Sequence, residues 1–306
     1  MGGGAPPIAF TLAHLSDLHV TPIQVRGLRD LAGKRALGWL SWRRRRRHEH
    51  RAEVLEALLA DLAAEAPDHV AITGDLTNVG LPGEIEAAVP WLERLGGPAR
   101  VSLVPGNHDA YGAVLDGGRL APWAPYLAGA GGPAPGAVGR FPYVRRLGPL
   151  ALVGLSSAVP TAPGLATGRL GEDQLDQLEL ELAALARERC CRVVLLHHPP
   201  LPAGQSWRRR LSDAAELRAV LARTGAELVL HGHTHRTSFE RVPGPVGAIP
   251  VVGVPSSSAL DHRPERRAQY HLYRIEPADR GFQLACSVRA LDLASIRFSA
   301  GRELDL

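Results

Sequence analysis

The chain has 306 residues, of which 45% are hydrophobic and 22% are charged, and its formal net charge at neutral pH is +4. This composition is typical of a globular protein, and the length is sufficient for one large domain or two small ones. The modest positive charge permits anionic partners without indicating nucleic acid. The three cysteines, two of them adjacent, favour neither a disulfide framework nor a cysteine-based zinc site.

The N-terminal segment begins Met1-Gly2-Gly3-Gly4 and lacks the basic start and apolar run of a signal peptide. No stretch approaches the roughly 20 apolar residues that a membrane-spanning helix requires. We therefore expect a cytoplasmic protein, with peripheral contact to the inner membrane surface as an open alternative.

The first half of the chain alternates short apolar runs with amphipathic stretches. Residues 8–15 predict a strand, and residues 49–66 predict a helix because Val54, Leu55, Leu58 and Leu62 recur at helical spacing. A buried strand at 69–73, a helix at 84–95 and a strand at 100–104 follow. The Pro- and Gly-rich segment 121–139 predicts a loop.

The second half continues the alternation and then changes character. Strands are predicted at 141–146 and 150–155, a long helix at 172–189, a strand at 192–196, a helix at 213–223 and a strand at 227–230. Four further strands are predicted at 237–242, 248–254, 269–275 and 282–288. Mixed βα units followed by a run of strands predict an α/β fold with two packed mixed β-sheets flanked by helices. We expect a single domain over residues 1–306, with its core at about 8–290.

Polar clusters follow five of the predicted strands. Because strand ends are where α/β folds place ligand-binding groups, these clusters are candidates for one common site. They are Asp17-Leu18-His19, Gly74-Asp75, Gly106-Asn107-His108-Asp109, His197-His198-Pro199 and Gly232-His233-Thr234-His235.

The residue types in these clusters indicate metal chemistry. Carboxylates, imidazoles and an amide oxygen suit Mn, Fe, Zn or Mg, and seven such ligands exceed what a single tetrahedral zinc ion needs. They suit two divalent ions bridged by one carboxylate, an arrangement that stabilises both the attacking and the leaving oxygen in phosphoryl transfer. The sequence therefore predicts a metal-dependent phosphoesterase.

The ordered set D-x-H, G-D, G-N-H-D, strand-end His and G-H-x-H resembles the calcineurin-like metallophosphoesterase family over roughly residues 8–260. The resemblance implies the β-sandwich of that family and two divalent metal ions. It implies that the first ion is held by Asp17, His19 and His235, and the second by Asn107, His197 and His233, with Asp75 bridging the pair. His197 is favoured over His198, since the first His of the pair is the ligand in similar sequences.

The same resemblance gives His108 a catalytic role, facing the scissile phosphate as a charge stabiliser or proton donor, with Asp109 positioned to orient it. The sequence departs from protein phosphatases of this superfamily, because Leu76 to Val79 follow the G-D motif and Asp109 replaces a Glu. It is similar to the bacterial phosphodiesterase branch. The implied reaction is hydrolysis of a phosphodiester or pyrophosphate bond in a small phosphorylated substrate, of cyclic-nucleotide or nucleotide-lipid type, by a metal-bridging hydroxide. A non-catalytic scaffold and a nuclease are the alternatives.

A basic insertion at residues 22–50 separates the first motif from the first long helix. Trp39 and Trp42 stand beside five consecutive arginines, Arg43 to Arg47. Tryptophan beside arginine is typical of segments that bind anionic membranes, and the same residues suit a polyanionic substrate or, less favourably, nucleic acid. The simplest interpretation is a surface helix with its tryptophans against the core and its arginines in water.

Overall fold

The computed structural model describes residues 9–19, 22–111, 114–128, 138–202 and 204–306. The loop expected at 121–139 begins with a short 3-10 helix, η3 (Ala121–Tyr126), and its Gly-rich centre at 129–137 lies outside the described residues. No helix in the described part of the chain combines the length and the apolar character needed to cross a bilayer.

Six strands form the first sheet in the order β12-β11-β10-β1-β2-β3. Its parallel half consists of β1 (Phe10–Leu15), β2 (His69–Ile72) and β3 (Val101–Leu103). Its antiparallel half consists of β10 (Gln269–Pro277), β11 (Phe282–Asp292) and β12 (Arg297–Asp305). The sheet therefore extends past the core limit of about 290 expected from the sequence. Only Phe298 of β12 is buried, so this edge strand gives no hydrophobic periodicity by which to find it.

The second sheet has the order β4-β5-β6-β7-β9-β8. Four parallel strands form its centre: β5 (Leu150–Gly154), β6 (Cys191–Leu195), β7 (Leu228–His231) and β9 (Ala248–Gly253). Antiparallel strands close both edges, β4 (Tyr143–Leu147) beside β5 and β8 (Ser238–Pro243) beside β9.

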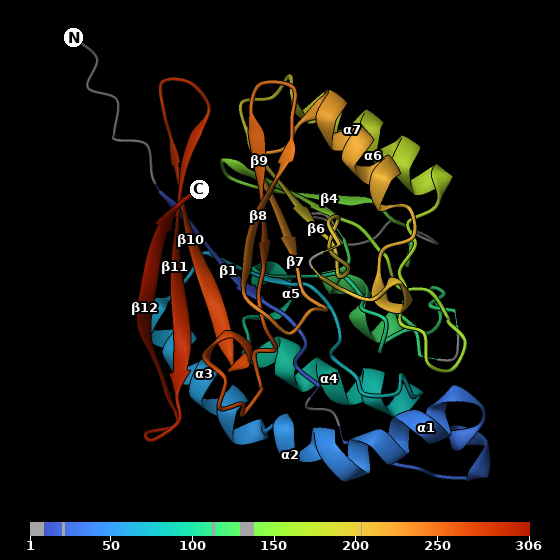
Figure 1. The fold of residues 1–306 in the computed structure, drawn as a ribbon. Helices are drawn as coiled ribbons and strands as arrows, with labels where there is room; N and C mark the ends of the chain where they lie inside the picture. The colour runs from blue at the N-terminus through green and yellow to red at the C-terminus, as the bar shows by residue number, and fades with distance from the viewer. Residues whose placement is uncertain (1–8, 20–21, 112–113, 129–137, 203) are drawn as a thin grey trace.

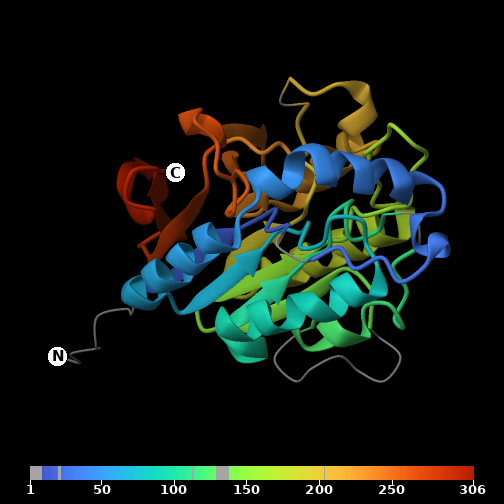
Figure 2. The same cartoon turned by 90° about the horizontal axis from the view of Figure 1, so that it is seen from below.

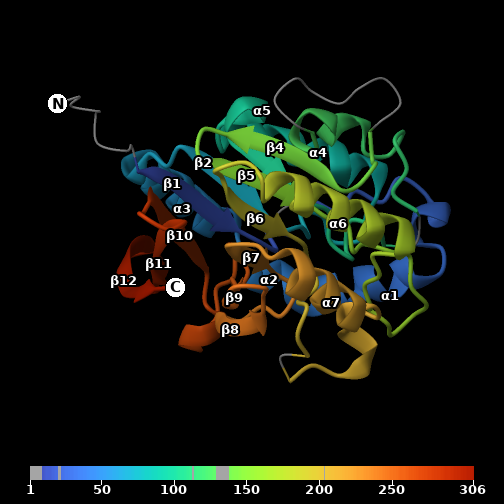
Figure 3. The same cartoon turned by 90° about the horizontal axis from the view of Figure 1, so that it is seen from above.

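The two sheets pack face to face, with helices on the outside (Figures 1 and 3). Leu12, Leu152, Val193 and Tyr273 belong to the apolar layer between the sheets. Helices α3 (Ala52–Glu65) and α4 (Pro82–Arg94) cover the first sheet, and α6 (Glu172–Leu185) and α7 (Ala214–Thr224) cover the second. The predicted α/β fold with two mixed sheets flanked by helices is confirmed.

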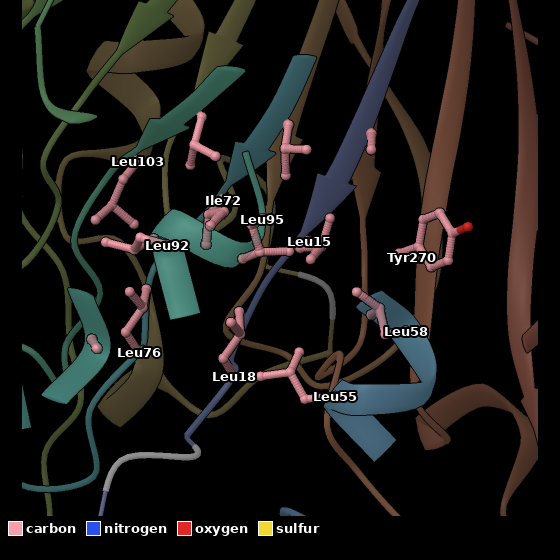
Figure 4. Close-up of a cluster of buried hydrophobic side chains, with 14 of the residues drawn as sticks. Leu15, Leu18, Leu55, Leu58, Ile72, Leu76, Leu92, Leu95, Leu103 and Tyr270 are labelled. Atoms are coloured by element: carbon pink, nitrogen blue, oxygen red, sulfur yellow. The ribbon is translucent and has the colours of Figure 1, made fainter. Parts of the chain in front are cut away.

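The core beneath α3 and α4 fixes the ends of the parallel strands. Leu15 and Ile72 at the ends of β1 and β2 lie in one apolar cluster with Leu55 and Leu58 of α3, and all four side chains are fully buried (Figure 4). Leu18, one residue beyond the Asp17 position, is buried in the same cluster. Burying each of these side chains contributes about 1.5–3 kcal/mol, so the loops that follow the strands are firmly anchored.

The insertion folds as a succession of short helices (Figure 2). These are η1 (Leu28–Leu31), α1 (Lys34–Ser41), the π-helical turn η2 (Trp42–Arg46) and α2 (Arg47–Glu49). The short helix α5 (Gly97–Arg100) lies outside the insertion, before β3. Lys34, the chain's single lysine, anchors α1 by donating hydrogen bonds to Thr161 Oγ1 at 2.6 Å and to the carbonyl of Leu165 at 2.7 Å. A Cβ at Gly38 would lie 2.8 Å from Val79 Cγ1, so this glycine allows α1 to pack closely on the rest of the protein.

Candidate metal centre

The strand-end motifs of both sheets meet at one place. The loops after β1, β2 and β3 carry Asp17 with His19, Asp75, and Asn107 with His108, while the loops after β6 and β7 carry His197, His233 and His235. All of these side chains except His233 and His235 are buried, and the latter two are half-buried.

The backbone of this site is strained in a specific way. Five non-glycine residues of the site have positive φ angles: Asp17 (52°), His19 (48°), Asp75 (56°), His233 (66°) and His235 (49°). Such conformations are unfavourable for L-residues and persist where the surrounding structure imposes them, most often at functional sites. The hydroxyl of Ser256 donates to the Asp17 carbonyl at 2.6 Å, and the Asp17 amide donates to the Gly74 carbonyl at 2.9 Å. The loops thus hold these side chains toward the site in backbone conformations that are unfavourable in themselves.

Two buried carboxylates stand among the imidazoles. Asp17 Oδ1 lies 3.1 Å from His235 Nε2, and Asp75 Oδ2 lies 3.3 Å from His197 Nε2. His19 Nε2 lies between the two carboxylates, 3.9 Å from Asp17 Oδ1 and 3.7 Å from Asp75 Oδ2. Asn107 Oδ1 is 3.1 Å from His197 Nε2. The donor atoms form two groups close enough to hold a cation each: Asp17, His19 and His235, and Asp17, Asp75 and His197.

Three of the histidines have the hydrogen-bond pattern of metal ligands. His19 Nδ1 is 2.8 Å from the Thr77 carbonyl, and His197 Nδ1 is 2.6 Å from the Thr73 carbonyl. His233 Nε2 is 2.9 Å from the Arg209 carbonyl. Metal-ligating histidines usually donate the other ring N–H to a carbonyl in this way, which fixes the tautomer and leaves the inner nitrogen as an acceptor.

The charge balance of the site also fits divalent cations. Asp17 Oδ1 is buried and accepts no hydrogen bond from the described residues, although His235 Nε2 is close by. Burial opposes ionisation of Asp17, but the adjacent His235 and His197 outweigh it, so the pKa of Asp17 lies below its ordinary value. Burial likewise disfavours a charged His197, yet Asp75 raises its pKa to about 9. Protons on these imidazoles therefore compensate the carboxylates, a role that bound cations can take over.

His198 differs from its neighbour His197. Its Nδ1 is 2.7 Å from Ser157 Oγ and its Nε2 is 3.2 Å from the carbonyl of Ala166, so both ring nitrogens have partners outside the carboxylate cluster.

His108 lies beside the cluster rather than within it. Its ring contacts His19 edge-on, with centroids 4.9 Å apart, and stacks on Tyr111 at 5.3 Å. Nδ1 is 2.6 Å from the carbonyl of Asn78 and 3.0 Å from Arg46 Nη1. Nδ1 must be protonated to donate to the carbonyl and unprotonated to accept from the guanidinium, so the two contacts select opposite tautomers of the neutral ring. Burial first, and then the positive charge of Arg46, holds the pKa of His108 well below its ordinary value.

Asp109 does not act on His108 in the way expected from the sequence. Its carboxylate accepts hydrogen bonds of 2.9 Å from the amides of Gly106, Asp75 and Thr77, and from the Thr77 hydroxyl at 2.9 Å. The ring of His108 is instead contacted by Asn78, Arg46 and Tyr111. Asp109 therefore joins the loops that follow β2 and β3, because a buried carboxylate is stabilised by several backbone N–H groups.

Arg46 and His50 of the insertion also belong to the site, although the sequence singled out neither. Arg46 reaches His108, and the ring of buried His50 lies 4.6 Å from that of His19. His50 Nδ1 is 3.1 Å from both Ser256 Oγ and Ser258 Oγ, so the loop that carries these serines supports this part of the site. Glu49, His50 and His235 form a further group of donor atoms close enough to hold a cation. The amide of His50, which caps α2, donates to the Arg46 carbonyl at 2.8 Å.

A cavity of about 380 Å³ opens over the carboxylate cluster. Its floor includes Asp75, Asn107 and His108, and its walls include Arg45, Arg46 and Glu49 from the insertion, together with Arg209 and Arg266. The interpretation of the insertion as a surface helix with all its arginines in water is therefore wrong for Arg46. Trp39 and Trp42 are half-buried, and Arg43, Arg44 and Arg47 are exposed.

Comparison with known proteins identifies related sequences and folds. A sequence model of the calcineurin-like phosphoesterase family matches residues 10–237. A probable cyclic nucleotide phosphodiesterase from Synechococcus is 27% identical over 228 residues, covering 72% of this chain and 77% of the relative. The 3′,5′-cyclic adenosine monophosphate phosphodiesterase of Escherichia coli K12 is 46% identical over 76 residues, which cover 24% of this chain and 27% of that protein.

Solved structures share the fold at low sequence identity. A dimetal phosphatase from Danio rerio superposes with a TM-score of 0.60 and 15% identity, covering 98% of both chains. A purple acid phosphatase from yellow lupin gives a TM-score of 0.62 at 13% identity, covering 98% of this chain and 54% of the other.

Proposed function

The chain belongs to the calcineurin-like phosphoesterase family, and on that premise we propose that it is a two-metal hydrolase of a phosphodiester or pyrophosphate bond in a small substrate. Enzymes of this family are metal-dependent phosphoester hydrolases that use two divalent ions. The observation that carries the proposal is the convergence of two buried carboxylates and four imidazoles beneath a cavity with cationic walls.

The ligand set expected from the sequence assigns the donor atoms to two ions. Asp17, His19 and His235 would hold one ion, because their donor atoms form one group. Asn107, His197 and His233 would hold the other, and Asp75 would serve both, since its Oδ2 lies near His197 and His19. When bound, the two ions would neutralise charge on the phosphate oxygens and activate water for attack on phosphorus. The ligand assignment favours His197 over His198, whose ring nitrogens are already engaged.

The residues around these ligands supply orientation and charge. Arg46 presents a guanidinium at the cavity wall beside His108, where it can bind a non-bridging phosphate oxygen. The Asn78 carbonyl favours a protonated His108 Nδ1, whereas Arg46 favours the neutral ring. In the imidazolium form, with Nδ1–H on the Asn78 carbonyl, Nε2–H would be able to protonate the leaving-group oxygen. Asp109 keeps the loops of Asp75 and Gly106 in register through the backbone amides that it binds.

A hydrolysis screen tests the proposal directly. Purified protein reconstituted with Mn, Mg or Zn is expected to hydrolyse phosphodiesters such as bis(p-nitrophenyl) phosphate faster than the monoester p-nitrophenyl phosphate. The screen should also contain cyclic nucleotides and nucleotide-sugar lipids, the two substrate types carried by the proposal. Metal-free protein is the control, and activity that is unchanged after metal removal would contradict the proposal.

We propose that the exposed arginines of the insertion bind an anionic membrane surface peripherally, from the cytoplasmic side. Leu37 is 57% exposed and Leu40 is 37% exposed, and the Arg43 guanidinium lies 5.4 Å from the centre of the Trp39 ring. Apolar and cationic groups are thus exposed on one short segment, as in interfacial helices.

Replacing Arg43, Arg44 and Arg47 with Gln is expected to abolish binding to phosphatidylglycerol vesicles at low salt and to spare hydrolysis of a small diester. Each arginine contributes about 1 kcal/mol at such a surface, so three account for more than a 100-fold change in affinity. Co-sedimentation with the vesicles measures the binding. The control variant replaces three exposed arginines elsewhere, at positions 187, 280 and 297. Failure of the wild-type protein to bind these vesicles would rule out membrane contact.

A further inference from the structure

A second cavity, of about 430 Å³, adjoins the one above the candidate metal centre. Its described wall contains no Asp or Glu. Four arginines line it: Arg208, Arg209, Arg236 and Arg266. Thr234, Arg209 and Arg266 line both cavities, so the two share a wall. A polar pocket with cationic walls is suited to an anionic group of the ligand that occupies the first cavity.

The charges of these four guanidinium groups are only partly compensated, since Asp261 and Glu265 act on Arg266 without pairing with it. None of them forms an ion pair within 4.0 Å of a carboxylate in the described residues. The nearby Asp261 is paired with Arg263 at 2.6 Å. Burial and the like charges of Arg236 and Arg263 lower the pKa of Arg266. Clustered cations with few counter-charges repel one another, and an anion between them reduces that repulsion.

Unused hydrogen-bonding groups lie in the same wall. Arg266 Nε is buried and has no hydrogen-bond partner among the described residues, and the same is true of both side-chain amide atoms of Gln205. Buried polar groups without partners are unfavourable, and those in a cavity wall can be matched by a bound group. An N–H of Gln205 and the Nε–H of Arg266 can both donate to phosphate oxygens.

The second cavity is physically tied to the metal centre. Thr234 lies between His233 and His235 in the sequence, and the carbonyl of Arg209 is 2.9 Å from His233 Nε2. The loop that carries Arg208 and Arg209 is thus held against a candidate metal ligand. An anion in the second cavity would therefore lie next to the phosphate that is being hydrolysed.

We propose that the second cavity binds an additional phosphate-type group of the substrate, so that the preferred substrates are pyrophosphate-linked or doubly phosphorylated rather than singly charged diesters. Arginine suits this role because its planar fork donates two parallel hydrogen bonds to a phosphate. A cyclic nucleotide monophosphate carries a single phosphate and would leave these arginines without an anion. This proposal rests on the proposed phosphoesterase function and specifies its substrate class.

Binding of inorganic pyrophosphate to the metal-free protein tests the site without catalysis. The variant Arg208→Gln/Arg236→Gln changes two arginines that line only the second cavity. It is expected to weaken pyrophosphate binding by at least about tenfold in isothermal titration calorimetry, since each lost charged hydrogen bond is worth roughly 1.5–3 kcal/mol. The control variant Arg187→Gln/Arg280→Gln removes the same charge from exposed positions outside both cavities and should bind like the wild type. Equal weakening in both variants, or in neither, would overturn the proposal.

Kinetics with two matched substrates test whether the second cavity contributes to the choice of substrate. Thymidine 5′-(p-nitrophenyl phosphate) and its 3′-phosphorylated form share the scissile bond and the leaving group. The wild-type enzyme is expected to show a KM at least about tenfold lower for the 3′-phosphorylated ester, and Arg208→Gln/Arg236→Gln should remove that advantage without changing kcat for the simpler ester. A wild type with the same KM for both esters refutes the substrate class. If neither ester nor bis(p-nitrophenyl) phosphate is cleaved, the proposed function fails, while the pyrophosphate titration still decides the binding site.

Discussion

The Asp75→Ala variant is expected to retain at most one of two divalent ions per chain and to lose hydrolytic activity almost completely. Asp75 Oδ2 faces His197 at 3.3 Å and His19 at 3.7 Å, so its removal takes a ligand from both proposed ions and leaves their charges less compensated. Loss of a group that only supports a ligand costs about 10- to 100-fold in metal affinity, and loss of a bridging ligand should cost more. Elemental analysis after reconstitution with Mn and gel filtration measures the metal content.

Two further variants separate metal loss from misfolding. Asp75 Oδ1 accepts a 2.7 Å hydrogen bond from the His108 amide, which Asp75→Asn can preserve while removing the charge. Asp213→Ala removes a carboxylate that binds the amides of Leu170 and Gly171 away from the cavity, so it should lower the melting temperature but keep both ions. Two-metal occupancy in Asp75→Ala and Asp75→Asn would remove Asp75 from the bridging position.

Most of the fold could be predicted from the sequence because its buried elements have clear periodicity. Strand β2 is buried at every position, and α3 places Val54, Leu55, Leu58 and Leu62 on one face, so apolar runs and helical spacing locate both. Strand β12 was missed because an exposed edge strand needs few apolar residues. Element boundaries also shifted by a few residues, as at α6, which ends at Leu185 rather than at 189.

The motif residues of the candidate site could be located in the sequence because each one follows a predicted strand. The insertion could not be placed, since nothing in a run of arginines shows which one faces inward. Arg46 is directed at His108 by the π-helical turn η2 and by the close contact of Gly38 with Val79, and both are tertiary features. The arginines of the second cavity come from segments about 25 to 60 residues apart and meet only in the fold.

Replacement of His108 by alanine is expected to leave both ions in place and to lower turnover by roughly 10²- to 10⁴-fold, the usual contribution of a positioned proton donor. The ring of His108 lines the cavity beside His19, and its Nδ1 is engaged by Asn78 and Arg46. It is therefore placed to act on substrate rather than on metal. Elemental analysis and steady-state kinetics of Mn-loaded protein measure the two effects, and exposed His262→Ala is the control that should change neither.

The size of the loss should depend on the leaving group. Phenyl and p-nitrophenyl esters of thymidine 5′-phosphate share the same phosphodiester framework, but phenolate is the stronger base and needs a proton more as the P–O bond breaks. If His108 Nε2–H donates that proton, His108→Ala should slow the phenyl ester by a larger factor than the p-nitrophenyl ester. Equal losses would assign His108 to charge stabilisation of the phosphate alone. Loss of metal from the variant would instead make His108 a ligand, in conflict with the carbonyl and guanidinium contacts that hold its ring beside the carboxylate cluster.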